Sequence, residues 1–298
     1  MKKIGFIGLG AMGYPMARNL LNTGYELYVC DVNPEAMQAL SGEGAQIVNL
    51  PREIAGISDV VITMLPDSPD VEAVYLGEHG LLSGAHDGLV LIDSSTIDPE
   101  VTRRIGREAS ALGVGMLDAP VGGNVTTAGQ GNLIMLVGGE ASLVDRCRHI
   151  LETLGERIIH AGPLGAGESL KLANNLMTGI YACLLAEGLT FAREAGVEEE
   201  KLFDLLRGNL PRLFEMLSTR MVEKNFLPGF KTRFMDKDLR LALGLGKSSD
   251  TPLPFASLAK RMFRLRIDRE LGEDDFASVL GNYEDERIRR LLSEYMAL

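Results

Sequence analysis

One short group of polar residues has the types and spacing needed for proton transfer. Lys171, Asn174, Asn175 and Thr178 are spaced at i, i+3, i+4 and i+7, so they share one face of a helix. The residues around them are largely apolar, and such surroundings disfavour the charged form of a lysine and lower its pKa. Lys171 is therefore a candidate proton donor or acceptor near neutral pH. A lysine with a buried stem and an ammonium group that reaches water would fit the same spacing.

A second segment has the glycine spacing of a dinucleotide-binding turn. Gly8-Leu9-Gly10-Ala11-Met12-Gly13 follows an expected strand and begins an expected helix. The first glycine permits a tight turn, the second lets the backbone approach a pyrophosphate, and the third lets helix and strand pack closely. Asp31 follows the next expected strand, where a carboxylate accepts hydrogen bonds from the ribose of NAD and repels the 2′-phosphate of NADP. A glycine-rich turn with a helix-capping aspartate is the alternative. The residues expected to bind NAD here are Gly8, Gly10, Ala11, Met12, Gly13 and Asp31.

Three further segments lie at the carboxyl ends of expected strands, where ligands bind in doubly wound sheets. They are Met64-Leu65-Pro66, Ser94-Ser95-Thr96 and Asp118-Ala119-Pro120-Val121-Gly122-Gly123-Asn124. The paired glycines of the last segment would let a substrate carboxylate contact backbone N–H groups. Lys237-Asp238 begins a later expected helix. Taken singly, each of these segments is more readily explained as loop or helix-cap chemistry.

The scaffold expected for these residues is an α/β fold. Short β-rich runs alternate with helical patterns in the first half of the chain, which predicts a mostly parallel, doubly wound sheet. The expected strands are Lys3–Ile7, Glu26–Cys30, Val60–Met64, Leu89–Asp93, Gly115–Asp118, Leu133–Val137 and Arg157–His160. After the glycine-rich segment 162–167 the pattern is helical throughout. The expected helices there are Glu168–Ala195, Glu198–Arg207, Leu210–Lys224, Phe234–Lys247, Pro254–Ile267, Asp274–Leu280 and Asp285–Tyr295.

These patterns predict two domains. Residues 1–162 form an NAD-binding Rossmann domain, and residues 163–298 form an all-helical C-terminal domain for substrate binding and oligomerisation that begins with a long interdomain helix. That first helix is apolar nearly all round, so it must be buried on most faces. A helical domain of this size can hardly surround it alone, and we expect a homodimer or homotetramer in which these helices pack between subunits.

The composition of the chain limits the classes of partner expected for the protein. A net charge of -11 argues against a nucleic-acid surface, and no run approaches the roughly 18 apolar residues that span a membrane. Cys30, Cys147 and Cys183 have no paired spacing, which indicates buried reduced thiols and a cytoplasmic protein. The four histidines show no ligand spacing, so no metal site is expected.

Together, the motifs resemble those of the β-hydroxyacid dehydrogenase family, in order and in spacing, over essentially the whole chain. This family includes 3-hydroxyisobutyrate dehydrogenase, tartronate semialdehyde reductase and sulfolactaldehyde reductase. The matching segments are the Gly8–Gly13 turn, Met64-Leu65-Pro66, Asp118-Ala119-Pro120-Val121, Gly162-Pro163-Leu164-Gly165-Ala166-Gly167, Lys171 with Asn174-Asn175, and Lys237-Asp238.

The resemblance implies NAD-dependent hydride transfer between nicotinamide and the hydroxyl or aldehyde carbon of a small 3-hydroxyacid or semialdehyde. It implies Lys171 as general acid/base, Asn175 as its positioning partner, Thr96 and Lys237 near the nicotinamide, and Met64 and Leu65 along the cofactor. The residues expected to bind a small anionic substrate are Ser95, Gly122, Gly123, Asn124, Lys171, Asn174, Asn175 and Thr178.

One position departs from the family pattern. Many members have a serine after Asp-Ala-Pro-Val, where its hydroxyl binds the substrate carboxylate, and this chain has Gly122. Sulfolactaldehyde reductase also has glycine there, followed by an arginine where this chain has Gly123. A sulfonated C3 aldehyde is therefore the specific alternative substrate. An imine reductase or a non-catalytic NAD-binding sensor would share the cofactor motif, but the presence of Lys171 beside two asparagines argues against both.

Overall fold

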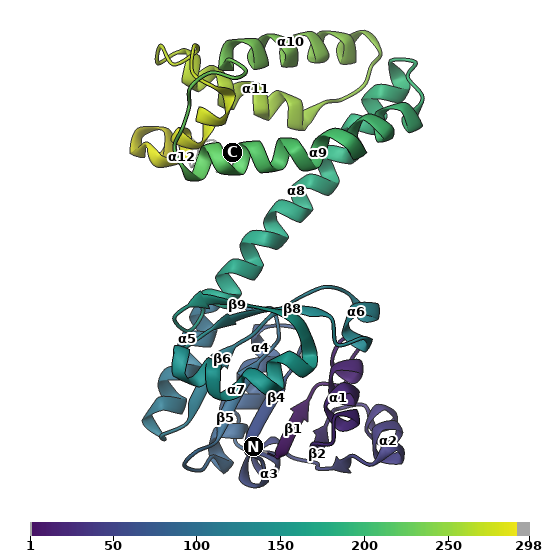
Figure 1. The fold of residues 1–298 in the computed structure, drawn as a ribbon, viewed down its shortest axis with the longest axis vertical. Helices are drawn as coiled ribbons and strands as arrows, with labels where there is room; N and C mark the ends of the chain where they lie inside the picture. The colour runs from purple at the N-terminus through teal and green to yellow at the C-terminus, as the bar shows by residue number, and fades with distance from the viewer. Residues whose placement is uncertain (1, 291–298) are drawn as a thin grey trace. The chain divides into compact units, whose positions relative to one another are not determined.

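The computed structural model describes residues 2–290 and divides into two compact units, one ending at Met177 and one beginning at Thr178 (Figure 1). The expected helix Asp285–Tyr295 therefore lies partly outside the described residues. Helix α8 (Ala166–Glu194) begins in the first unit and continues into the second.

The first unit is built on one sheet with the strand order β3-β2-β1-β4-β5-β6-β8-β7, and β9 pairs with β8. The strands from β1 to β6 are parallel, as are β8 and β9, whereas β8 runs antiparallel to β6 and β7. The strands are β1 Lys3–Ile7, β2 Glu26–Cys30, β3 Gln46–Ile47, β4 Val60–Thr63, β5 Val90–Asp93, β6 Gly115–Asp118, β7 Val121–Gly122, β8 Leu133–Gly138 and β9 Gly155–Gly162.

Both faces of the sheet are buried, because alternate strand residues enter two separate hydrophobic clusters. Phe6 and Ile62 pack on one face with residues of α1 and α7, while Ile7 and Val61 pack on the other with residues of α3, α4 and α5. The helical elements of this unit are α1 Gly13–Asn22, α2 Pro34–Glu43, α3 Pro51–Ile57, α4 Ser68–Leu76, η1 Leu81–Gly84, α5 Pro99–Ala111, α6 Val125–Gly129 and α7 Ala141–Leu154. The expected doubly wound Rossmann fold is confirmed.

The second unit is helical in the part that the structure describes. Its elements are the rest of α8, α9 Glu199–Val222, α10 Thr232–Ser248, α11 Pro254–Ile267, η2 Phe276–Leu280 and α12 Gly281–Glu284. The carboxylate of Glu187 on α8 caps α11, accepting hydrogen bonds of 2.8 Å from the N–H groups of Phe255 and Ala256. The prediction of two helices between Glu198 and Lys224 is wrong. A single helix, α9, runs through Pro211, although a proline removes one donor from the helix ladder and its ring crowds the carbonyl four residues earlier.

Apolar side chains remain exposed along these helices. None of the residues of α9 is buried, and Leu176 on α8 and Phe214 on α9 are 64% and 67% exposed. Cys183 is exposed as well, so the expectation of three buried thiols is wrong at this position, while Cys30 and Cys147 are buried. Burial raises the pKa of each of these two thiols to about 11.

Helix α8 also corrects the expectation about membrane-spanning segments. It has 29 residues and an 18-residue window with a mean hydropathy of 1.2, so it is long and apolar enough to cross a bilayer. Length and composition are weak evidence for a single helix, because the core helix of a soluble protein meets the same criteria. Only 6% of that window is buried within the described chain.

Candidate active site

The turn between β1 and α1 has the shape that its glycines predict. Gly8 has φ of 95°, and a side chain there would collide with the carbonyl oxygen of Met64. A side chain at Gly13 would collide with the carbonyl oxygen of Gly8. A Cβ at Gly10, by contrast, would meet nothing within 4 Å. Two glycines thus close the turn onto the strand, and the third leaves open space beside the backbone.

The residues around this space fit a dinucleotide. Helix α1 has no acidic residue in its first turn and no side-chain cap, so its N–H donors and partial positive charge are available to a pyrophosphate. Asp31 accepts hydrogen bonds from the N–H of Leu9 and, at 2.6 Å, from the N–H of Asn33. These bonds fix the carboxylate beside the turn and leave further acceptor positions for ribose hydroxyls. Asn33, rather than Asp31, caps α2, so the capping alternative does not account for this aspartate.

A buried hydrogen-bond network supports the next two strand ends. Oδ1 of Asp93 accepts from the hydroxyls of Thr63 and Ser95 at 2.7 and 2.6 Å, and from the N–H of Ser95 at 3.1 Å. The Ser95 hydroxyl in turn accepts from the N–H of Leu65 at 2.9 Å. Because the Thr63 hydroxyl donates its proton to Asp93, the Tyr75 hydroxyl is the donor in the 2.9 Å hydrogen bond between Tyr75 and Thr63. Ser95 is fully buried and links the Met64-Leu65 segment to β5, while Thr96 beside it is half-buried.

Asp118, at the end of β6, holds the start of α8. Its Oδ1 accepts from the N–H of Gly165 at 2.7 Å and its Oδ2 from the N–H of Glu168 at 2.8 Å. A carboxylate stabilises a helix N-terminus because the first N–H groups have no partner within the helix. A Cβ on Gly167 would lie 2.8 Å from Asp118 Oδ2, and one on Gly138 would collide with Oδ1. The sequence pattern puts Asp118 in a candidate substrate segment and does not reveal this anchoring role.

Lys171 lies one helical turn beyond this anchored start. It is half-buried, and burial lowers the pKa of its ammonium group, against a smaller opposite effect from Glu168. Asn174 and Asn175 follow on the exposed side of α8, with Asn174 Nδ2 3.4 Å from Asn175 Oδ1. The first unit thus brings Lys171 and both asparagines together on one helix, as their spacing predicts. Thr178 on the same helix and Lys237 on α10, paired with Asp238 at 2.8 Å, belong to the second unit.

The segment after Asp118 forms a short strand and a tightly capped helix. Asn124 caps α6: its Oδ1 accepts from the N–H of Thr127 at 3.1 Å, and its own N–H donates to Thr127 Oγ1 at 2.8 Å. Gly123 has φ of 135°, and a Cβ there would lie 2.5 Å from Thr127 Oγ1 and 2.8 Å from Leu133 Cδ2. A Cβ on Gly122 would only touch Ile134, at 3.4 Å. This backbone therefore accepts a small side chain at Gly122 but not at Gly123.

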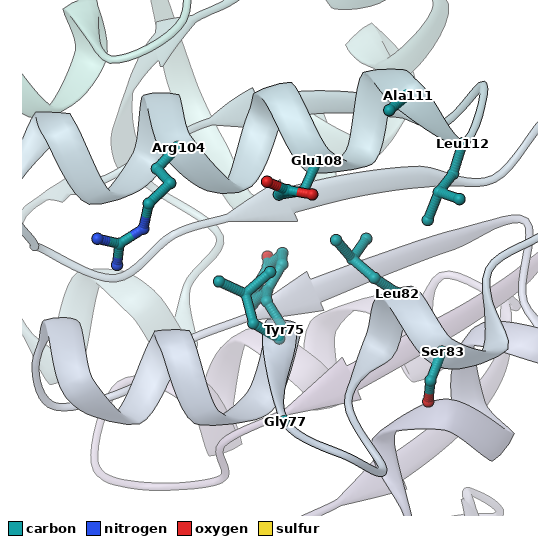
Figure 2. Close-up of a pocket in the computed structure, with 9 residues that line it drawn as sticks. Tyr75, Gly77, Leu82, Ser83, Arg104, Glu108, Ala111 and Leu112 are labelled. Atoms are coloured by element: carbon teal, nitrogen blue, oxygen red, sulfur yellow. The ribbon is translucent and has the colours of Figure 1, made fainter.

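A separate pocket, with a volume of about 430 Å³, lies between α4, η1 and α5. Figure 2 shows Arg104 and Glu108 projecting from α5 over Tyr75 and Leu82. None of the residues expected at the active site lines this pocket. Within residues 2–290, no group of three or more His, Cys, Asp or Glu side chains is arranged to hold a metal ion.

Comparison with known protein families gives two matches that together span most of the chain. Residues 3–162 match the NAD binding domain of 6-phosphogluconate dehydrogenase. Residues 165–283 match the NAD-binding family of NADP-dependent 3-hydroxyisobutyrate dehydrogenase. The chain belongs to the β-hydroxyacid dehydrogenase family. The two matches meet between residues 162 and 165, where we propose the domain boundary.

Individual members of the family are similar over nearly their whole length. The mitochondrial 3-hydroxyisobutyrate dehydrogenase of Mus musculus is 35% identical over 292 residues, which cover 95% of this chain and 87% of the mouse protein. The NAD-dependent L-serine dehydrogenase of Pseudomonas aeruginosa is 36% identical, with 94% of this chain and 97% of that protein covered. This β-hydroxyacid dehydrogenase is accordingly an NAD-dependent oxidoreductase.

Solved structures show the same fold. Mycobacterium tuberculosis 3-hydroxyisobutyrate dehydrogenase with L-serine has a TM-score of 0.68 and 31% identity, covering 96% of this chain and 100% of the other. The V8 variant of an imine reductase from Myxococcus stipitatus, in complex with NAD⁺, has a TM-score of 0.86 but 19% identity, over 96% of this chain and 100% of that one. At that identity the likeness to the imine reductase concerns the fold alone.

Proposed function

We propose that this enzyme interconverts a small carboxylated 3-hydroxyacid and its semialdehyde, with Lys171 as the general acid/base. The observation that carries the proposal is the placement of Lys171. It is half-buried on α8, one turn beyond a helix start that Asp118 fixes to the sheet. Burial lowers the pKa of its ammonium group, so Lys171 releases and accepts a proton more readily near neutral pH than an exposed lysine does.

The proton chemistry follows from this placement. NAD, when bound, supplies the hydride acceptor for oxidation, and its reduced form supplies the hydride for reduction. In oxidation, neutral Lys171 accepts the proton of the substrate hydroxyl. In reduction, protonated Lys171 donates a proton to the aldehyde oxygen, and its positive charge stabilises the negative charge that develops there. Asn175, on the same helix face, is proposed to position the lysine and the substrate oxygen.

The named activities of the relatives support a substrate of this class. The mouse and Pseudomonas proteins are named for 3-hydroxyisobutyrate and L-serine, which are both small carboxylates with a hydroxymethyl group. The sulfonate alternative has less support in this chain, because the backbone at Gly123 leaves no room for the arginine of sulfolactaldehyde reductase. Asn124 uses its backbone N–H and its Oδ1 in the capping box of α6. Its Nδ2 and the backbone N–H of Gly123 take no part in that capping box.

An NADH-consumption assay tests the proposed reaction directly. The panel contains carboxylated and sulfonated C3–C4 semialdehydes and cyclic imines, and the reverse assay uses NAD with the corresponding hydroxyacids. We expect turnover with carboxylated semialdehydes and 3-hydroxyacids. Turnover confined to imines would identify an imine reductase, turnover confined to sulfonates would identify the alternative substrate, and no turnover would favour a non-catalytic sensor.

Substitution of Gly122 tests where the acid group binds. Gly122→Ser adds a hydroxyl that the local packing accepts, since the new Cβ would lie 3.4 Å from Ile134. If this segment holds the carboxylate, the added donor should lower KM for carboxylates by about 2- to 10-fold, the equivalent of one hydrogen bond. It should also change the ranking of carboxylates against sulfonates, while KM for NADH stays the same. Val125→Ser, at an exposed neighbouring position, is the control. An unchanged ranking would mean that the acid group binds elsewhere.

Asp31 is expected to make the enzyme prefer NAD to NADP, measured as the ratio of kcat/KM. Asp31→Ser with Val32→Arg should shift that ratio toward NADP by about 10-fold or more, because it removes a repulsive charge and adds a charged hydrogen-bond donor. Val32 is 100% exposed, so the arginine fits. Val32→Arg alone keeps the carboxylate and should shift the ratio less. Equal kcat/KM values for the two cofactors in the wild type would contradict the assignment.

We also propose that the enzyme is a homodimer or homotetramer. The apolar residues exposed on α8 and α9 include Leu176, Met177, Ile180, Leu184, Phe203 and Phe214. Of these, Leu176, Ile180 and Leu184 recur every four residues along one side of α8, and an exposed apolar stripe of this kind is typical of a subunit interface. Sedimentation velocity checks the oligomeric state, and a monomer at micromolar concentration would contradict the proposal.

A further inference from the structure

Glu168 is a buried acid that has no role in the reaction proposed above. Its side chain is 0% exposed, although it lies in the first turn of α8. The backbone N–H of Glu168 donates to Asp118, and its Oε2 accepts from the N–H of Ile97 at 3.2 Å. Its Oε1 is buried and has no hydrogen-bond partner. The carboxyl group is thus held against the loop that follows β5 instead of reaching water.

The groups that face Glu168 are mostly acidic. Asp93 at the end of β5 is fully buried, and its Oδ2 also lacks a hydrogen-bond partner. Asp118 at the end of β6 lies beneath the same helical turn. Lys171, three residues later on α8, provides an opposing positive charge. Tyr75 on α4 reaches the cluster through Thr63 and Asp93.

This environment keeps the proton on Glu168 at neutral pH. Burial, followed by the negative charges of Asp93 and Asp118, raises the pKa of Glu168 to about 9, against the opposing effects of the Ile97 N–H and of Lys171. Burial also raises the pKa of Asp93 and of Asp118. A neutral acid with an unsatisfied Oε1 is less costly to bury than a carboxylate in the same position.

We propose that Glu168 is a positioning residue for Lys171: as a buried, neutral carboxylic acid in the first turn of α8, it leaves the lysine without a counter-charge. This inference rests on the proposed role of Lys171. An ionised Glu168 one turn away would favour the ammonium form, and the lysine would then be a poor base. The neutral acid allows Lys171 to release its proton more readily, and the two groups titrate as a coupled pair.

Two substitutions distinguish a neutral from an ionised Glu168 in the pH profile of hydroxyacid oxidation. Glu168→Gln keeps the size and the neutral state of the side chain, so the rise of kcat/KM with pH should stay where it is in the wild type. Asp93→Asn removes the charge that disfavours the Glu168 carboxylate, so Glu168 ionises more easily, Lys171 keeps its proton, and the rise should move to higher pH. The double variant should match Glu168→Gln, because Asp93 acts through Glu168. Glu152→Gln, at an exposed position on α7, is the control.

Thermal stability gives a readout that does not depend on activity. A buried acid whose pKa is raised in the folded state contributes stability that is complete below its unfolded-state pKa, near 4.5, and is lost as pH rises toward about 9. The Tm of Glu168→Gln minus that of the wild type should therefore grow between these two values and level off above pH 9. A Tm difference that is independent of pH would overturn the proposal. A Glu168→Gln profile that moves to lower pH would also overturn it, because Glu168 would then be ionised in the wild type. If Lys171 proves dispensable while the Tm difference still grows, the role of the lysine fails and the neutral state of Glu168 stands.

Discussion

Lys171→Ala should lower kcat by about 100-fold or more and leave the Kd for NADH nearly unchanged. The expected loss is the range found when a general acid or base is removed. Binding of NADH should persist because the β1–α1 turn and Asp31 form their contacts without α8. Steady-state kinetics and a fluorescence titration with NADH measure the two quantities separately.

Lys171→Arg separates charge from proton transfer. The guanidinium keeps the positive charge but does not exchange its proton near neutral pH, so this variant should also fail in turnover. Lys201→Ala, at an exposed position on α9, is the comparison because it removes a lysine to which no role in binding or catalysis is assigned. A Lys171→Ala enzyme that keeps a third of the wild-type kcat would exclude the proposed role.

Much of the sheet could be predicted because local signals delimit its strands. β1, β2 and β6 begin and end at the expected residues, since each is a short β-rich run bounded by charged, glycine or loop residues. β3 and β7 have two residues each, too few to show any periodicity. They form through pairing with β2 and β8, which is a property of the tertiary structure.

In the candidate site, as in the sheet, features set by neighbouring residues could be predicted, and features set by contacts between residues distant in sequence could not. The spacing of Lys171, Asn174 and Asn175 is local, and it correctly predicted a shared helix face. The burial of Glu168 depends on Ile97, 71 residues earlier, and on strand ends that only the fold brings near. Ser95 carried an expectation of substrate contact, but the fold places its hydroxyl inside the sheet, bonded to Asp93 and Leu65. A polar residue at a strand end can face the ligand or the interior, and the sequence alone does not distinguish the two.

The largest structural effect is expected for Asp118→Ala. The change removes the acceptors of two buried N–H groups, those of Gly165 and Glu168, which lie 47 and 50 residues away in the sequence. Each unpaired buried donor costs about 1–3 kcal/mol, so the loss should be roughly 2–6 kcal/mol. For a protein of this size that corresponds to a decrease in Tm of about 3–10 °C. Asp145→Ala is the matched control, because that aspartate forms an exposed ion pair with Arg148, and its loss should cost less than about 0.5 kcal/mol.

We expect Asp118→Ala to lower activity as well as stability. Separate measurements of kcat and of KM for NADH test the anchoring role of Asp118. The bonds of Asp118 fix the first turn of α8, so their loss displaces the lysine that α8 carries one turn later. Misplacement of a catalytic group by about 1 Å is enough to lower the rate by about 100-fold, and we expect kcat to drop by about 10-fold or more at a temperature where the variant is folded. KM for NADH should change little, because Asp118 makes no contact with the β1–α1 turn among its hydrogen bonds. An Asp118→Ala enzyme with the Tm of Asp145→Ala and wild-type kcat would show that the start of α8 is held by packing alone.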